Sequence, residues 1–319
     1  MSHSFNALPL ADHQVAELDL HLLRRRLRAT QSPCDTKSKV DGRELKSFCS
    51  NDYLGLANHP VLIAALIEGA RLYGVGSGAS HLISGHSVAH ELLEKKLASF
   101  QNPHIPQARA LFFSTGYLAN LTAITGLTRL APAGQASISS AKLNHASLID
   151  GVRLASAQNK ANLTLFDHTQ LNSLIESLQN DQRSLKLIVT DGVFSMDGDL
   201  APIQKLLAIA EQYDALLLVD DAHGFGVLGP QGRGILEQDN IHSERVIYVG
   251  TLGKAAGVSG AFICAHDSFI EWIIQKGRPY ISSTATPPAI ASAVLKSLEI
   301  IESDEGKQRR SHLNQLIDI

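Results

Sequence analysis

Cysteine, aromatic side chains and a surplus of charge of one sign are all scarce in this chain of 319 residues. Its three cysteines, Cys34, Cys49 and Cys264, lie far apart with no CxxC pair, which argues against a disulfide framework or a zinc site and indicates a reducing compartment. The net charge is −3, so no basic surplus points to nucleic acid or an anionic membrane as a partner. No apolar run reaches the roughly 20 residues that span a bilayer, and the first residues lack the basic and apolar segments of a signal peptide. We therefore expect a cytoplasmic protein that acts neither on nucleic acid nor in a membrane.

Apolar residues are plentiful, at 44% of the chain against 18% charged residues, which is typical of a globular protein with a large core. An apolar stripe beside a run of arginines predicts an amphipathic helix over residues 11–30. From residue 48 onward, short apolar runs alternate with helical patterns. We predict three parts: an N-terminal helical segment (1–47), a large α/β domain (48–288) and the start of an incomplete C-terminal domain (289–319).

The alternation within the large domain is typical of a mostly parallel sheet with helices on both faces. We predict strands at Ala110–Phe113, Leu187–Thr190, Leu216–Asp220, Val246–Val249 and Ala261–Cys264, and helices at about 117–129, 170–179, 202–213 and 289–302. In such sheets ligands bind outside the carboxyl ends of the strands. Polar residues that directly follow these strands are therefore candidate site residues.

Three segments at these strand ends carry groups suited to chemistry. Gly116 opens a helix after a strand, and backbone amides at such a helix N-terminus suit a phosphate. Asp220 ends the strand LLLVD with His223 three residues on, a pair that could serve a metal, a triad or a heteroaromatic cofactor. Lys254 lies between small residues just after a buried strand, where desolvation lowers the pKa of an amine and makes it nucleophilic. A fourth group, His145, lies on a predicted turn.

A phosphate cradle, an acid, a histidine and a buried lysine together are the groups that pyridoxal phosphate (PLP) requires. No further carboxylate or histidine at zinc spacing supports a metal site. The P-loop pattern is absent. The segment GVGSG (74–78) lacks the third glycine of a dinucleotide-binding turn and follows no strand.

The motifs resemble those of the α-oxoamine synthase family of fold-type I PLP enzymes. The strings that carry the resemblance are SNDYLGL (50–56), YGVGSGASHLISG (73–85), FSTGYLANL (113–121), LNHASLIDG (143–151), VTDGVFSMDGDLAP (189–202), LLLVDDAHGFGVLGPQGRG (216–234), TLGKAAGVSGAF (251–262) and STATPP (283–288). They occur in the family's order from Ser50 to Pro288.

The resemblance implies a role for each matching residue. It places the Schiff base with the cofactor on Lys254, pairs Asp220 with the pyridine nitrogen and His223 with the phenolic oxygen, and stacks His145 on the ring, where it also serves catalysis. It implies that Gly116, Tyr117 and Thr251 hold the phosphate, that Ser195 lies beside the cofactor, and that Asn51 contacts substrate. Arg24 matches the position that meets the distal carboxylate of a pimeloyl chain.

The implied reaction is a decarboxylative condensation of L-alanine with a pimeloyl thioester, on CoA or a carrier protein, within biotin biosynthesis. Three alternatives stay open: the condensation of glycine with acetyl-CoA, an aminotransferase, and an inactive partner subunit. The presence of Lys254 together with Asp220 and His223 argues against the last of these. The resemblance also implies a homodimer with its active site between the subunits. The residue that grips the amino-acid carboxylate is expected in a C-terminal segment that this sequence does not contain.

Overall fold

The computed structural model describes residues 7–318 of the chain, which forms two units, Met1–Phe48 and Cys49–Ile319. The smaller unit contains helix α1 (Ala7–Leu20) and a hairpin of strands β1 (Lys37–Val40) and β2 (Arg43–Lys46). The hairpin turns at Asp41 and Gly42, both with positive φ, as a two-residue turn between twisted strands requires. Residues 1–6 of the predicted N-terminal segment and Ile319 lie outside the described range.

The predicted helix over residues 11–30 is wrong in its bounds, because α1 begins at Ala7 and ends at Leu20. Leu22 adopts a φ of 56°, and the amide of Leu23 donates to the carbonyl of Leu18, a left-handed helix ending of the Schellman type. None of the residues of α1 is buried. Most of the stability of a helix comes from packing of its apolar face. Since α1 buries none of its residues, the apolar spacing alone is not enough to continue the helix to the arginines at 24–28.

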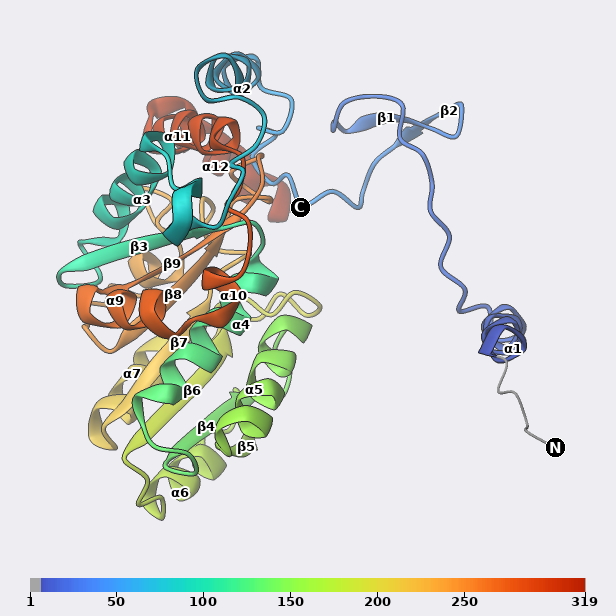
Figure 1. Cartoon of the computed structure of the whole chain (residues 1–319). Coiled ribbons are helices and arrows are strands. Elements are labelled where there is room, and N and C mark those ends of the chain that lie inside the picture. The colour runs from blue at the N-terminus through green and yellow to red at the C-terminus, as the bar shows by residue number, and fades with distance from the viewer. Residues whose placement is uncertain (1–6, 319) are drawn as a thin grey trace. The chain divides into compact units, whose positions relative to one another are not determined.

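The larger unit is built on a seven-stranded sheet with the order β3-β9-β8-β7-β6-β4-β5 (Figure 1). Its strands are β3 (Ala108–Phe113), β4 (Ala136–Ala141), β5 (Asn162–Phe166), β6 (Leu185–Asp191), β7 (Ala215–Asp220), β8 (Val246–Thr251) and β9 (Ala261–His266). β9 runs antiparallel to both of its neighbours, and the pairs among β5, β4, β6, β7 and β8 are parallel. This sheet confirms the predicted α/β class.

Helices cover both faces of the sheet (Figure 1). They are α2 (Pro60–Tyr73), α3 (Val88–Gln101), α4 (Gly116–Leu127), α5 (Ala146–Asn159), α6 (Asn172–Gln179), α7 (Ile203–Gln212), α8 (Ile235–Gln238), α9 (Asp267–Lys276), α10 (Arg278–Ile281), α11 (Pro288–Glu302) and α12 (Asp304–Ile317), with a π-helical turn at His81–Gly85 and a 3-10 turn at Thr128–Leu130. α4, α5 and α9 bury their apolar side chains in one cluster, and α3, α6, α7 and α11 bury theirs in another.

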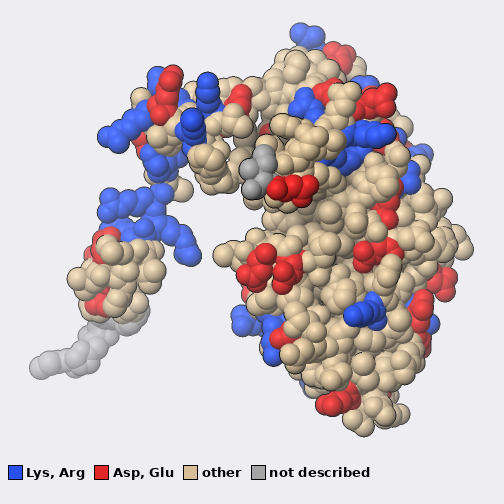
Figure 2. All heavy atoms as spheres, turned by 180° about the vertical axis from the view of Figure 1, so that it is seen from behind, with Lys and Arg blue, Asp and Glu red and all other residues tan. Residues whose placement is uncertain are grey.

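The strands supply both clusters because successive side chains point to opposite faces. Along β7, Leu216 and Leu218 join the cluster of α4 and α5, whereas Leu217 and Val219 join the cluster of α3 and α11. Lys, Arg, Asp and Glu are interspersed over the face of this unit seen in Figure 2. Across residues 7–318, no helix is long and apolar enough to cross a bilayer.

Candidate active site

The carboxyl ends of the parallel strands meet at one edge of the sheet, and a cavity of about 170 Å³ lies there. It is lined by Gly116, Tyr117, His145, Ser147, Asp191, Ser195, Asp220, Ala222, His223, Thr251 and Lys254. All eight residues that the sequence assigns to cofactor binding are in this set. Asp220 and Thr251 are the last residues of β7 and β8, and the others lie in segments that follow strands, so the parallel topology itself gathers them.

Lys254 lies in the loop after β8, and its Nζ is 2.7 Å from Nε2 of His223. Burial lowers the pKa of this lysine, while the carboxylates of Asp220 and Asp191 oppose the shift. Burial, followed by the charges of Lys254 and His145, lowers the pKa of His223 to about 4, so the imidazole is neutral near pH 7. A less basic amine beside a neutral imidazole is suited to nucleophilic attack and to carrying a proton.

Asp220 is buried at the end of β7, where its two oxygens accept hydrogen bonds. Asn120 Nδ2 donates to Oδ2 over 2.5 Å, and the amide of Ala222 donates to Oδ1 over 3.0 Å. Burial raises the pKa of Asp220, because both donors are neutral and only partly replace water. A buried carboxylate with neutral hydrogen-bond partners is stabilised by a cationic N–H donor, and a protonated pyridine nitrogen is such a donor. Asp220 and its surroundings therefore fit the ring of PLP.

The start of α4 fits the phosphate of that cofactor. Thr115 caps the helix by accepting the amide of Leu118 over 3.1 Å. The amides of Gly116 and Tyr117 belong to the first turn and have no acceptor within the helix. Both residues line the cavity, so their amides and the positive end of the helix dipole are available to an anion. Thr251 also lines it, with its hydroxyl donating to the carbonyl of Gly260 over 3.3 Å.

His145 caps the start of α5 at the cavity wall. Its amide donates to Asp191 Oδ2 over 2.7 Å, and its Nδ1 lies 2.7 Å from the hydroxyl of Ser147. The ring is thus fixed through Nδ1. Asn51 does not line the cavity; its Oδ1 lies 3.3 Å from the hydroxyl of Tyr53. Arg24 belongs to the smaller unit, where its Nη1 is 2.6 Å from Asp19 Oδ2.

The predictions from sequence did not include three residues that shape this site, Tyr53, Asn120 and Asp191. Asn120 is four residues after Gly116, a spacing that places both on one face of a helix. Asp191 ends β6 in register with Asp220 at the end of β7, but the predicted strand stops one residue earlier, at Thr190. Tyr53 is within the string SNDYLGL, and no local pattern indicates its contact with His223, which lies 170 positions away.

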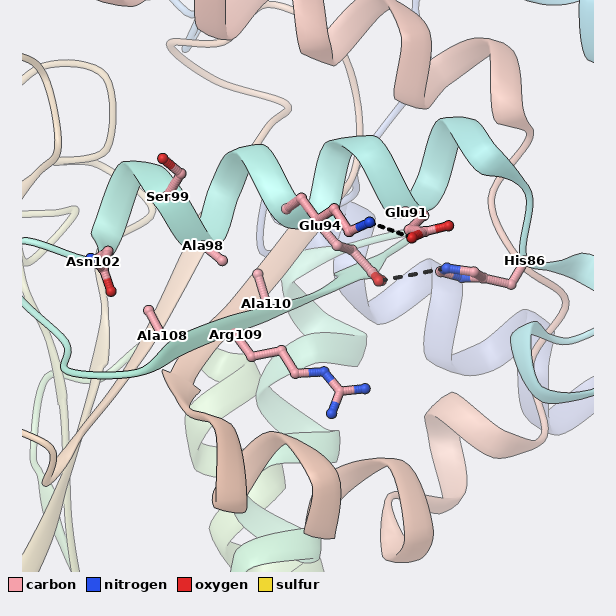
Figure 3. A pocket seen from close by; sticks show the side chains of 10 residues that line it. His86, Glu91, Glu94, Ala98, Ser99, Asn102, Ala108, Arg109 and Ala110 are labelled. Atoms are coloured by element: carbon pink, nitrogen blue, oxygen red, sulfur yellow. Dashed lines mark hydrogen bonds and ion pairs between the residues drawn. The ribbon is translucent and has the colours of Figure 1, made fainter.

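A second, larger cavity of about 590 Å³ lies between α3 and the edge strand β3 (Figure 3). Glu94 reaches across from α3, accepts the outward-facing amide of Phe112 over 2.9 Å and lies 3.8 Å from Nε2 of His86. Burial raises the pKa of Glu94 to about 7, although Arg109 opposes the shift and Glu91 adds to it. The carboxyl group of Glu94 thus satisfies a backbone donor on the edge of the sheet. The lysine that lines this larger cavity, Lys95, pairs with Glu91 at the surface.

We predict that Glu94 makes the free energy of unfolding depend on pH. Its pKa rises on folding from 4.5 to about 7, so the folded chain holds more protons and stability falls as pH rises through that interval. At about 1.4 kcal/mol per unit of pKa, the loss is about 3 kcal/mol. Glu94→Gln keeps an oxygen for Phe112 and should flatten this loss in urea titrations at a series of pH values. Glu211→Gln, a change at an exposed residue of α7, is the control and should leave the slope as it is, and an equal slope in wild type and Glu94→Gln would contradict the assignment.

Among residues 7–318, His81, His86 and His90 form a further cluster, whose candidate ligand atoms lie within 4.8 Å of one another. Nδ1 of His81 is 3.0 Å from Nδ1 of His86. His90 accepts the amide of Ser87 at Nδ1 and donates from Nε2 to the carbonyl of Thr286. Both ring nitrogens of His90 are therefore engaged within the protein, and the cluster ties the start of α3 to the segment before α11.

The sequence matches the family model "Aminotransferase class I and II" over residues 43–319. It is 56% identical to an 8-amino-7-oxononanoate synthase of a Janthinobacterium species, over 96% of this chain and 76% of that protein. An 8-amino-7-oxononanoate synthase of Bordetella petrii is 54% identical, over 96% of this chain and 75% of its own length. The chain thus spans about three quarters of these relatives.

Solved structures agree with this grouping. An 8-amino-7-oxononanoate synthase from Francisella tularensis has a TM-score of 0.70 at 36% identity, covering 85% of this chain and 72% of that one. Serine palmitoyltransferase from Sphingomonas wittichii has a TM-score of 0.84 at 28% identity, covering 99% and 76%. Serine palmitoyltransferase from S. paucimobilis with a bound PLP–myriocin aldimine has a TM-score of 0.83 at 28% identity, covering 94% and 74%. The chain therefore belongs to the class I and II aminotransferase family and, within it, to the 8-amino-7-oxononanoate synthases, with the fold of type I PLP enzymes.

Proposed function

We propose that this protein is a PLP-dependent acyltransferase that joins L-alanine to a pimeloyl thioester, on CoA or a carrier protein, and yields 8-amino-7-oxononanoate for biotin biosynthesis. The observation that carries the proposal is the single cavity in which the amine of Lys254, the buried carboxylate of Asp220 and the N-terminus of α4 meet. The names and identities of the relatives support the same activity. We further propose that the eight residues assigned from sequence hold the cofactor.

The reaction forms a carbon–carbon bond between Cα of alanine and the carbonyl carbon of the thioester, releases the thiol, and loses the alanine carboxyl group as CO2. When bound, PLP supplies the electron sink that stabilises negative charge at that Cα. Lys254 removes and returns the proton at Cα, since burial keeps its pKa below that of a free amine. Asp220 holds the ring nitrogen protonated. His145 closes one wall of the cavity and positions the acyl carbonyl.

We also infer that the protein works in the cytoplasm as a homodimer. Large exposed apolar side chains gather on α2 and the segment that follows it: Val61, Ile63, Leu66, Ile67, Leu72, Tyr73, Val75, Leu82 and Ile83. A concentration of this kind on a water-soluble protein marks an interaction surface. It supports the expectation that two copies associate through the larger unit.

The test is a pair of assays with added PLP, read by mass spectrometry for the aminoketone. L-Alanine with pimeloyl-CoA should give 8-amino-7-oxononanoate, and glycine with acetyl-CoA should give no product above background. Product from the glycine pair alone would favour the shorter-chain condensation instead. An amino-group exchange with keto acids, without CoA consumption, would favour an aminotransferase.

Arg24→Ala should raise the KM for the pimeloyl thioester about tenfold and leave the KM for L-alanine within twofold, because one charge-assisted hydrogen bond contributes about 1.5 kcal/mol. The effect is confined to the pimeloyl thioester because only this substrate has a distal carboxylate, for which Arg24 would be the cationic partner. Arg26→Ala is the matched control, since Arg26 also lies near Asp19, at 3.9 Å. Equal losses for both substrates would remove the case for Arg24.

A further inference from the structure

A hydrogen-bonded chain of three side chains leads from the surface of the larger unit to the reactive lysine. The hydroxyl of Tyr53 is 2.6 Å from Nδ1 of His223, and Nε2 of the same ring is 2.7 Å from Nζ of Lys254. The ring of Tyr53 packs against the hydrophobic cluster that contains Leu54 and Leu56. Packing of the ring therefore fixes the position of the hydroxyl relative to His223.

The segment that carries Tyr53 is held on both sides. The carboxylate of Asp52 accepts the amides of Leu56 and Ala57 over 2.9 and 3.0 Å. Arg309 on α12 donates to the carbonyl of Leu54 over 2.8 Å. These bonds fix the backbone of residues 52–57, so Tyr53 keeps a constant position relative to the sheet.

The loops that carry Lys254 and His223 pack directly on this segment. A Cβ atom placed on Gly257 would lie 2.6 Å from the amide nitrogen of Ala57. One placed on Gly226 would lie 2.9 Å from Cβ of Ala255. Both glycines have positive φ, and their lack of a side chain allows the close approach. The three loops form one packed body, which preserves the distances along the chain from Tyr53 to Lys254.

Each ring nitrogen of His223 can donate or accept, depending on the tautomer, and the short contact of the Tyr53 hydroxyl favours donation to Nδ1. O–H donors make bonds of about 2.5–3.0 Å, whereas N–H donors centre near about 2.9 Å. The 2.6 Å contact with Nδ1 is in the range of a hydroxyl donor, and the 3.3 Å contact of the same hydroxyl with Asn51 is outside it. A neutral imidazole that accepts at Nδ1 carries its hydrogen on Nε2. That hydrogen then faces Lys254.

We propose that Tyr53 is a positioning residue for the reaction, whose hydroxyl holds His223 as the tautomer with hydrogen on Nε2 and so directs a hydrogen-bond donor at Lys254 and at the group this lysine binds. Lys254 and His145 are the other titratable groups whose charges act on His223, and both disfavour a second proton on the ring. The tautomer is a property of the protein alone. Its consequence for catalysis rests on the proposed function.

Nitrogen-15 NMR of the full chain labelled at histidine tests the tautomer without cofactor or substrate. His223→Gln identifies the signals of His223 by their loss. In wild type, Nε2 should carry the hydrogen and Nδ1 should be an acceptor. In Tyr53→Phe, which keeps the packed ring, the Nδ1-protonated form should become populated. A wild-type ring protonated on Nδ1, or the same tautomer in both proteins, would overturn the proposal.

A second measurement separates positioning from mere stability. With PLP bound, Tyr53→Phe should shift the midpoint of the pH titration of cofactor absorbance and lower kcat about fivefold to tenfold, with the KM for L-alanine nearly unchanged. Tyr213→Phe is the control, because the hydroxyl of Tyr213 accepts from Gln212 Nε2 over 3.3 Å, and it should shift neither quantity. A lower melting temperature with an unchanged midpoint would assign Tyr53 a structural role only. If the NMR spectra show the expected tautomer but the protein has no synthase activity, the proposed function is contradicted and the assignment of the tautomer is retained.

Discussion

Replacing Lys254 by alanine should abolish condensation, with kcat falling at least about 10³-fold, and should also abolish covalent attachment of the cofactor. The first loss follows because, among the residues that the structure describes, no other lysine lines the cavity, so the proton at Cα has no amine to receive it. The second follows because a Schiff base requires a primary amine. The fold should persist, since the alanine removes a charged head and leaves the Ala255 and Ala256 packing intact.

Borohydride reduction followed by peptide mapping checks this prediction. Wild type should carry the reduced cofactor on the peptide that contains Lys254, and the variant should carry none. Lys296→Ala is the control, because Lys296 is a surface residue whose Nζ pairs with Glu299 over 2.7 Å. A reduced adduct on a different lysine, or an adduct that survives in Lys254→Ala, would refute the assignment.

Changing Asp220 to asparagine should lower kcat by about 10²–10³, the effect of removing one preorganised electrostatic group from an active site. Both carboxylate oxygens of Asp220 accept hydrogen bonds, from Asn120 and from the amide of Ala222. An amide has a single acceptor oxygen, so one of these contacts is lost. The neutral side chain also stops favouring a protonated ring nitrogen, which weakens the electron sink.

Steady-state kinetics and the absorbance of the bound cofactor together test this expectation. The variant should still bind PLP covalently through Lys254, with weaker affinity, while turnover falls. Asp214→Asn is the matched control, because Asp214 is exposed and pairs with Arg245 over 2.8 Å. Turnover within threefold of wild type in Asp220→Asn would show that this carboxylate does not serve the ring nitrogen.

Much of the candidate site could be predicted because its residues follow strands. Asp220 is the last residue of a strand whose apolar run is visible in the sequence, and Gly116 and Lys254 lie three residues after two others. Parallel strands end at one edge of the sheet. Strands without an apolar run were not predicted. β4 reads ASISSA, and its serines are buried, so burial there is decided by the neighbouring strands β5 and β6 rather than by hydrophobicity.

The end of α1 illustrates the opposite error. The spacing of leucines beyond Leu20 is helical, but Leu22 takes a left-handed conformation and Leu27 is fully exposed. A periodic pattern states which face a helix would bury if it packed. Whether it packs is a property of the surfaces around it.

The sequence by itself determined the α/β class, the strand-end positions of the cavity residues and, through several ordered motifs, the family. Only the tertiary structure decided which partners complete the site. Asn120 meets Asp220 across 100 positions, and Tyr53 meets His223 across 170. Local rules of propensity and capping act over a few residues, whereas contacts between distant segments depend on how loops pack once the sheet has formed. The physical reason is that a hydrogen bond of this kind contributes only about 1 kcal/mol, so packing of the larger surfaces sets its geometry.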